Sequence, residues 1–225
     1  MILIRKNKEP IEWTNYCSTP GVGYQSIPAL VESLLIEQGY ICAYCMRRIP
    51  HKDKLYKRDG SSYSLTSEDH RVEHIKSREH HQALELKYSN MVICCPGHIG
   101  DKDHCDRAKS SNDISFSPLD SSFIDTLSYS SDGRIRSSNP TFNSDIEKIL
   151  NLNTKLLVLN RKSVLDEVIK MINSYHKSNR QWSKNILRAV LDKYENMHQE
   201  DGKQMYYPYC GIIIWYLRRK LKQLP

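Results

Sequence analysis

Four cysteines in two groups have the spacing of a structural zinc site. Cys42 and Cys45 form a Cys-x-x-Cys pair, and Cys95 and Cys105 follow further along the chain. Four thiolates around a tetrahedral zinc leave no open coordination position, which is typical of a structural rather than a catalytic site. Cys94 competes with Cys95, because neighbouring strand residues point to opposite faces and only one can reach the ion. The sequence therefore predicts a structural Zn²⁺ held by four cysteines.

The cysteine usage favours metal over disulfides. The chain has seven cysteines, an odd number that cannot form a complete set of disulfides. No run near the start resembles a secretory signal, so we expect a cytoplasmic protein whose thiols stay reduced. His98 and His104 are further candidate zinc ligands. Cys17 and Cys210 lie outside the motif and are predicted to be ordinary buried thiols.

A second group of residues combines acids with a histidine: Glu73-His74, Asn90 and Asp106. Hydrolysis of a phosphodiester at neutral pH needs a base for the attacking water and a cation for the phosphate. His74 suits the base if it is neutral and oriented by a backbone carbonyl. Glu73 and Asp106 offer the hard oxygen ligands that Mg²⁺ or Mn²⁺ prefers. Because strand neighbours alternate faces, Glu73 and His74 can serve one site only if the strand twists or ends there.

These two groups together resemble the HNH, or ββα-metal, endonucleases in their zinc-stapled form. That family carries an acid–histidine pair on a first strand, an Asn at the start of a second, and a polar residue at the head of a helix, followed by a Lys. The matching residues are Glu73-His74, Asn90, Asp106 and Lys109. The resemblance implies His74 and Asn90 as catalytic residues and Glu73 and Asp106 as ligands of a catalytic Mg²⁺ or Mn²⁺. Lys109 is expected to contact the substrate.

The wider sequence is similar to the PtuB family of HNH proteins from Septu and retron anti-phage defence systems. The likeness covers most of residues 1–165 and includes the Cys42-Ala-Tyr-Cys45 knuckle, Asp132-Gly-Arg-Ile, and the stretch from Leu150 to Arg161. It implies a toxic effector nuclease in a complex with a PtuA-type ATPase of the ABC/SMC-like class. In retron-linked members a reverse transcriptase with its DNA–RNA product joins the complex. The target, DNA or tRNA, stays open.

A basic segment follows the knuckle. Residues 47–58 contain six Lys and Arg but one Asp, and a loop of this kind beside a nuclease site is suited to backbone phosphates. A merely solvated loop explains the same composition equally well. The predicted substrate contacts are Arg47, Arg48, Lys52, Lys54, Lys57 and Arg58.

The net charge of +7 is unevenly distributed. Residues 1–145 carry 18 Lys and Arg against 19 Asp and Glu, whereas residues 146–225 carry 15 against 7. The basic part of the chain is therefore not the part that holds the motif. It is suited to a polyanion or an acidic partner, although a solvated basic helix face has the same composition.

The surrounding elements predict an α+β protein with a zinc-stapled ββα-metal (HNH) core and a mainly helical C-terminal region. Residues 1–41 are expected to form an irregular lead-in and a helix capped by Ser26 and stopped by Gly39. Residues 42–145 are expected to form the core, with a hairpin in which residues 123–129 and 133–136 flank the Asp132-Gly133 turn. Residues 146–225 are expected to be helical, with a break at Asp201-Gly202, and to dock a partner or nucleic acid after a capping box that begins at Ser144.

A different class of function has to be weighed against the nuclease. The same cysteines can build a zinc-ribbon nucleic-acid-binding module, or an assembly module, in which the acid–histidine residues are only structural. Such a module would bind without any dependence on divalent metal.

Overall fold

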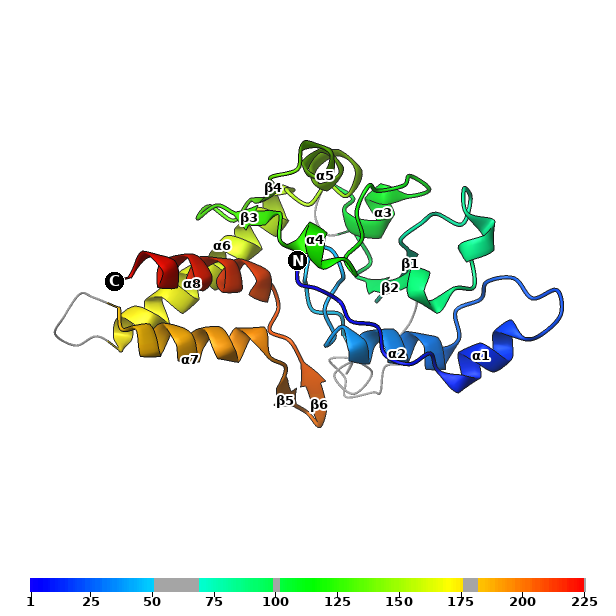
Figure 1. Ribbon diagram of the computed structural model, residues 1–225, viewed down its shortest axis with the longest axis horizontal. Coiled ribbons are helices and arrows are strands. Elements are labelled where there is room, and N and C mark those ends of the chain that lie inside the picture. Colours follow the sequence, from blue (N-terminus) through cyan, green and yellow to red (C-terminus); the bar gives the residue numbers. More distant parts are fainter. Residues whose placement is uncertain (51–68, 99–101, 176–181, 225) are drawn as a thin grey trace, which may run out of the picture.

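The structure is a computed structural model that describes residues 1–50, 69–98, 102–175 and 182–224. It is an α+β protein with short antiparallel sheets and a helical C-terminal part, as the sequence predicted (Figure 1). In the described part, the α-helices are α1 (Ile11–Cys17), α2 (Pro28–Glu37), α3 (Cys105–Lys109), α4 (Ser121–Ile124), α5 (Pro140–Ser144), α6 (Lys155–Ser174), α7 (Lys184–Glu195) and α8 (Cys210–Gln223).

The strands pair in three hairpin-like sheets. They are β1 (Arg71–His74), β2 (Met91–Cys94), β3 (Leu127–Tyr129), β4 (Ile135–Ser137), β5 (His198–Glu200) and β6 (Lys203–Met205). Each sheet of the described residues is one antiparallel pair: β1 with β2, β3 with β4, and β5 with β6. The register of the first pair places Glu73 opposite Val92 and His74 opposite Met91. Helix α3 follows β2 along the chain. Two strands and a helix therefore follow one another around the acid–histidine residues.

The N-terminal part differs from the expected irregular lead-in. Residues 11–17 form α1, whose Trp13 is fully buried and donates its Nε1–H to the carbonyl of Leu86 at 3.3 Å. Helix α2 begins at Pro28 with the extended Ile27 before it, so Ser26 is not its cap. Gly39 ends the helix as predicted, in a left-handed conformation (φ 56°) that favours glycine.

The predicted hairpin forms from β3 and β4, with Tyr129 opposite Ile135. Gly133 has φ 97°, and a Cβ there would lie 2.2 Å from the carbonyl oxygen of Val158 on α6. Only glycine fits this close approach. Phe123, which the sequence placed in the first strand, lies in α4 and packs its ring on Phe116 at 3.8 Å.

The expected helix start at Ser144 is wrong. Helix α5 begins at Pro140, and Asn139 caps it by accepting from the backbone N–H of Thr141 at 2.9 Å. Ser144 ends this helix, and a π-helical turn continues to Ile149. Ser144 does not cap a helix, because it has helical dihedral angles (φ −61°, ψ −43°) and its side chain accepts no capping hydrogen bond. The neighbouring Asp145 bonds a distant segment, and its carboxylate accepts from the backbone N–H of Ser115 at 2.7 Å.

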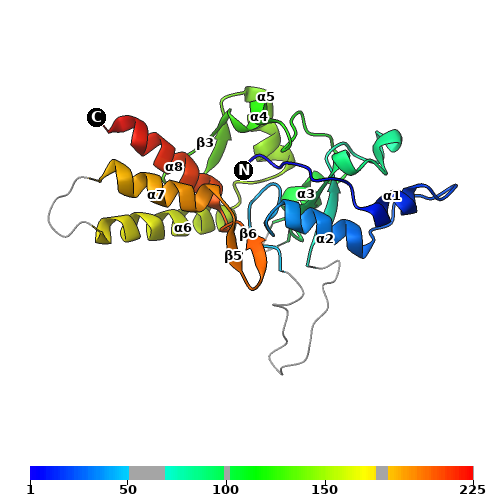
Figure 2. The same cartoon turned by 60° about the horizontal axis from the view of Figure 1, so that its bottom comes forward.

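The C-terminal part is built from α6, α7 and α8, which Figures 1 and 2 show side by side at one end of the molecule. Helix α8 buries Ile212, Ile213 and Leu217. Sequence reasoning read Asp201-Gly202 as a helix break, but it is the turn of the β5–β6 hairpin. One cluster of buried apolar residues runs from the N-terminal segment through the knuckle to these helices. Among the described helices, none has the length and apolar character needed to cross a membrane.

Candidate metal centre and acid–histidine site

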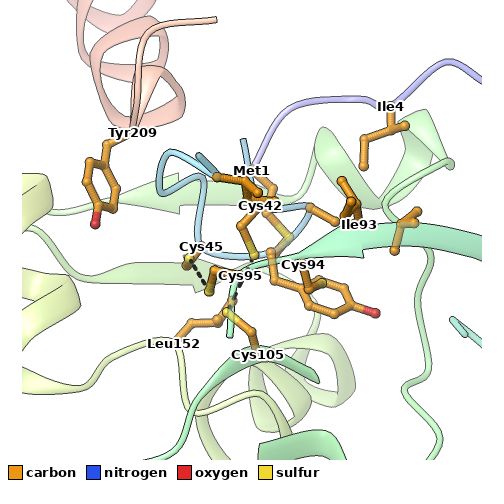
Figure 3. Close-up of a cluster of buried hydrophobic side chains, with 14 of the residues drawn as sticks. Met1, Ile4, Cys42, Cys45, Ile93, Cys94, Cys95, Cys105, Leu152 and Tyr209 are labelled. Atoms are coloured by element: carbon orange, nitrogen blue, oxygen red, sulfur yellow. Dashed lines mark hydrogen bonds between the residues drawn. The ribbon is translucent and has the colours of Figure 1, made fainter. Parts of the chain in front are cut away.

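Cys42, Cys45, Cys95 and Cys105 lie together in the interior, as predicted (Figure 3). All four thiols are within 4.8 Å of one another. The Sγ atoms of Cys42 and Cys105 are 3.8 Å apart, and those of Cys45 and Cys95 are 3.7 Å apart. Sulfurs about 2.3 Å from a tetrahedral zinc lie about 3.8 Å from each other, so this cluster has the dimensions of such a site. The four cysteines could hold a metal ion such as zinc.

Three separate segments position the four thiols. The knuckle closes when the N–H of Cys42 bonds the carbonyl of Arg47 at 2.9 Å, and Met46 turns the chain with φ 63°. Cys95 directly follows β2. Cys105 opens α3, where its N–H bonds the carbonyl of Leu150 at 2.8 Å. The cluster therefore joins the knuckle, the strand and the helix.

The pKa values of the clustered thiols also favour the binding of a cation. Burial by itself raises the pKa of Cys42, but the hydrogen bonds from its neighbouring thiols together outweigh this and hold the pKa well below its ordinary value. Burial and the other thiols raise the pKa of Cys105 well above it. One buried thiolate therefore opposes ionisation of the next, and only a bound cation lets all of them ionise.

Cys95 and not Cys94 belongs to the cluster. The alternation of side chains along a strand had predicted that only one of the two could, without deciding which. Cys94 is buried and its pKa is raised well above the ordinary value, first by burial and then by Cys42. The candidate histidines lie outside the four-ligand set. His104 places its Nδ1 3.1 Å from the sulfur of Cys105, and His98 contacts Asp103 at 2.7 Å.

Glu73 is 3% exposed and is surrounded by hydrogen-bond donors. Its Oε1 accepts from the hydroxyl of Tyr44 at 2.9 Å and contacts the ammonium of Lys109 at 2.9 Å. Burial and then the neighbouring Asp106 carboxylate raise the pKa of Glu73 well above its ordinary value. Asp106 forms an ion pair with Arg71, two residues before Glu73 on the same face of β1. The two carboxylates thus lie together between two cations.

His74 is the last residue of β1, and the residue is 6% exposed. Its Nε2 lies 2.9 Å from the carbonyl oxygen of Glu85, which can only accept, so Nε2 carries the proton. The lone pair is therefore on Nδ1. Burial lowers the pKa of His74 to about 4, so the ring is neutral at pH 7. The ring of Tyr24 contacts it edge-on, with centroids 4.6 Å apart.

Asn90 holds the loop between β1 and β2 in place. Its Oδ1 accepts from the N–H of Lys76 at 2.9 Å, and its Nδ2 donates to the carbonyls of Lys76 at 3.0 Å and Leu84 at 3.3 Å. Because Glu85 follows Leu84, this side chain fixes the backbone carbonyl that orients His74.

The alternation of strand faces separates Glu73 from His74. Glu73 shares its side of β1 with Tyr44 and Lys109, whereas His74 faces Tyr24. Asp106 acts on both residues. Burial and then Asp106 raise the pKa of Glu73, whereas for His74 burial lowers the pKa and the Asp106 charge opposes it only as the smallest of several effects. The strand also ends at His74, as a shared site requires.

The predicted substrate contacts need correction at two positions. Lys109 is 1% exposed, so it cannot reach a substrate; it pairs with Glu73 and donates to the carbonyl of His74 at 3.0 Å. Arg48 donates to the carbonyls of Gly39 at 3.2 Å and Tyr206 at 2.8 Å, so it ties the knuckle to the residue that directly follows β6.

Arg47 is only partly exposed, and its Nη1 is buried. The remaining predicted phosphate contacts, Lys52, Lys54, Lys57 and Arg58, lie outside the described residues.

Sequence reasoning missed three contacts of the site. Tyr44 is the second spacer residue of the knuckle, and it reaches Glu73 because the knuckle lies against β2. Arg71 was detectable in principle, since residues two apart on a strand share a face. Tyr24 carries no local signal, because only the tertiary fold brings residues 18–27 over His74.

Neither the protein-family models nor the curated protein sequences contain a match to this chain.

Proposed function

We propose that this protein is a metal-dependent endonuclease of the HNH type that hydrolyses phosphodiester bonds in DNA or tRNA. The observation that carries the proposal is a neutral, oriented histidine at the end of β1, electrostatically coupled to a buried carboxylate pair. Zinc stapling of the knuckle to β2 and α3 would keep these groups in place, since the cysteines lie on the same elements.

His74 is suited to act as the general base. With Nε2–H donated to Glu85, the free Nδ1 lone pair can accept a proton from a water molecule. The water oxygen then bonds to phosphorus, and the bond from phosphorus to the leaving oxygen breaks. The leaving oxygen takes up a proton from bulk water and departs as a hydroxyl, and His74 returns its proton to solvent. Asn90 serves this step by holding the Leu84–Glu85 backbone against the imidazole.

Glu73 and Asp106 are the residues that would hold a catalytic Mg²⁺ or Mn²⁺. The donor set fits, because both are hard carboxylate oxygens and their proximity raises the pKa of Glu73. A cation there supplies positive charge to the scissile phosphate and the leaving oxygen. Lys109 holds Glu73 in position and favours its ionised form against the effects of burial and Asp106, because its ammonium donates to Glu73 and to the carbonyl of His74.

The partner proposal follows from the resemblance to PtuB proteins. We place this chain as the toxic effector of an anti-phage complex with a PtuA-type ATPase, joined in a retron by a reverse transcriptase and its DNA–RNA product. Deletion of residues 146–225 is not a clean test of such a complex. Leu150 and Leu152 are fully buried, and Leu150 bonds the backbone of Cys105, so the deletion would disturb the zinc cluster.

The deciding experiment uses zinc-loaded wild type and His74→Ala with plasmid DNA and with total tRNA. Each is incubated with Mg²⁺, with Mn²⁺, or without added divalent metal. We expect metal-dependent cutting by the wild type and a loss of about 10²–10⁴-fold in rate in the variant. His80→Ala, at an exposed histidine in the loop that follows β1, is the matched control. Equal cutting by His74→Ala and wild type would refute the base assignment.

A zinc-ribbon binding or assembly module without catalysis is the second candidate. The observation that favours it is the internal pairing of both acids, Glu73 with Lys109 and Asp106 with Arg71. Acids paired in this way can serve stability alone. This candidate requires nucleic-acid binding by the wild type that does not respond to Mg²⁺ or Mn²⁺, with no cutting of either substrate even when the ATPase partner is added.

A further inference from the structure

A cleft of about 720 Å³ lies between α8, the N-terminal segment and the β3 region. Its volume falls within the range of ligand-binding pockets. Figures 1 and 2 show α8 on one side of the N-terminal segment and α3 on the other, so this cleft is remote from the acid–histidine site. The lining side chains used below are Arg5, Asp125, Glu195, Trp215, Arg218, Arg219 and Lys222.

The charge of this lining is mainly positive. Arg218 is neutralised by Glu195, whose Oε1 accepts from its Nε at 2.7 Å and lies 2.6 Å from its Nη2. Among the described residues, no carboxylate forms an ion pair with Arg5, Arg219 or Lys222, and all three are exposed. Asp125 is the other carboxylate of the lining. The cleft therefore offers uncompensated cations to an anionic ligand.

Aromatic rings lie among these cations. Trp215 and Arg219 are four residues apart on α8, and the guanidinium lies 5.5 Å from the ring centroid. Tyr216 and Lys220 repeat the arrangement at 5.6 Å. A second pocket of about 170 Å³ is lined by all four of these residues, so the two pockets adjoin at Trp215 and Arg219. A basic groove with aromatic rings is how proteins bind single-stranded nucleic acid without reading its sequence.

We propose that this cleft binds a single-stranded segment of nucleic acid, with phosphates on Arg5, Arg219 and Lys222 and a base against Trp215. The assignment rests on the proposed function in taking the polyanion to be the substrate itself. Charge complementarity and the aromatic rings favour nucleic acid over an acidic protein, which would engage the cations alone. The cleft would hold a strand remote from the site of cutting, so it should affect substrate affinity and not the chemical step.

The test measures binding of labelled single-stranded DNA and RNA to the full-length, zinc-loaded chain by fluorescence anisotropy. The chain carries His74→Ala, and no Mg²⁺ or Mn²⁺ is present. The variant is Arg219→Ala with Lys222→Ala, and the matched control is Lys162→Ala with Lys170→Ala on α6, which removes the same charge from exposed positions. Circular dichroism verifies that both are folded.

We expect the α8 variant to lose about ten-fold in affinity and the α6 control to stay within about two-fold. The slope of log affinity against log salt should flatten by about 1.4, because each phosphate contact contributes about 0.7 on a single strand. Trp215→Phe, which keeps an aromatic ring, should bind better than Trp215→Leu. Equal losses in the α8 and α6 variants would overturn the proposal. So would equal binding of heparin, a polyanion without bases, which would point to an acidic protein partner.

Cleavage assays with chains that keep His74 separate this inference from the nuclease proposal. If the cleft binds as expected but wild type cuts nothing even when the ATPase partner is added, the binding site stands and the nuclease proposal fails. If wild type cuts and the α8 double variant cuts with the same KM, the binding proposal fails by itself. We expect a raised KM with an unchanged kcat in that variant.

Discussion

The ammonium of Lys109 lies 2.9 Å from Glu73 Oε1, and both side chains are almost completely removed from solvent. The sequence predicted that Lys109 contacts the substrate. The structure instead places Lys109, three residues after Asp106 on α3, in the interior, where it pairs with Glu73 and not with Asp106. A buried ion pair of this kind does not need to add net stability, but the loss of one partner leaves an uncompensated charge.

Lys109→Met should therefore destabilise the protein by about 3–5 kcal/mol in denaturant unfolding at pH 7. The double change with Glu73→Gln should recover part of that loss, because the orphaned carboxylate is gone. Lys87→Met, at an exposed lysine, is the control and should change stability by about 0.5 kcal/mol or less. A Lys109→Met variant as stable as this control would contradict the buried pair.

The two adjacent cysteines should differ in zinc content. Cys95→Ala should lose the metal, because three thiolates leave the tetrahedral set open, whereas Cys94→Ala should keep one zinc per chain. Both side chains are fully buried, so the two variants are matched in burial and in volume change. Metal analysis of the purified proteins, followed by thermal unfolding, gives the result. Zinc loss from Cys94→Ala with retention in Cys95→Ala would reverse the assignment.

Acidification should destabilise the protein through His74. Burial lowers the pKa of this ring from 6.5 to about 4. Between these two pH values the ring is protonated in the unfolded chain and neutral in the folded chain. The stabilisation is complete above pH 6.5 and is lost as the pH falls towards 4, by roughly 3 kcal/mol at most. The free energy of unfolding of wild type should thus decrease more steeply than that of His74→Asn over this interval. Parallel curves would exclude His74 as the cause.

Arg161 should be needed for the packing of the β3–β4 hairpin on α6. Its guanidinium is buried and donates to the carbonyls of Gly133 and Leu152, each at 2.6 Å. Arg161→Met should cost about 3 kcal/mol, because two buried carbonyls lose their donor. The neighbouring Lys162→Met, at an exposed pair with Asp166, should cost less than about 0.5 kcal/mol in the same denaturant titration. Similar costs for both would contradict this role.

The parts that could be predicted from the sequence are those set by local spacing. The cysteine spacing predicted the four-thiol cluster, and the periodicity of the C-terminal part predicted its helices. Asp132-Gly133 predicted the first hairpin through turn chemistry, yet the same signal at Asp201-Gly202 was read as a break. All four strands are three residues long, but β5 (HQE) and β6 (KQM) lack the apolar residues that Leu127, Tyr129 and Ile135 supply to β3 and β4.

The sequence by itself determined which residues could bind a metal and where helices and turns are favoured, because those properties depend on side-chain type and short-range geometry. Only the tertiary structure decided that Cys95 and not Cys94 joins the cluster, that Lys109 is buried against Glu73, and that Tyr24 covers His74. Each of these outcomes depends on how segments distant in the sequence pack. The balance of burial and charge that follows from such packing is not encoded in any one stretch of the chain.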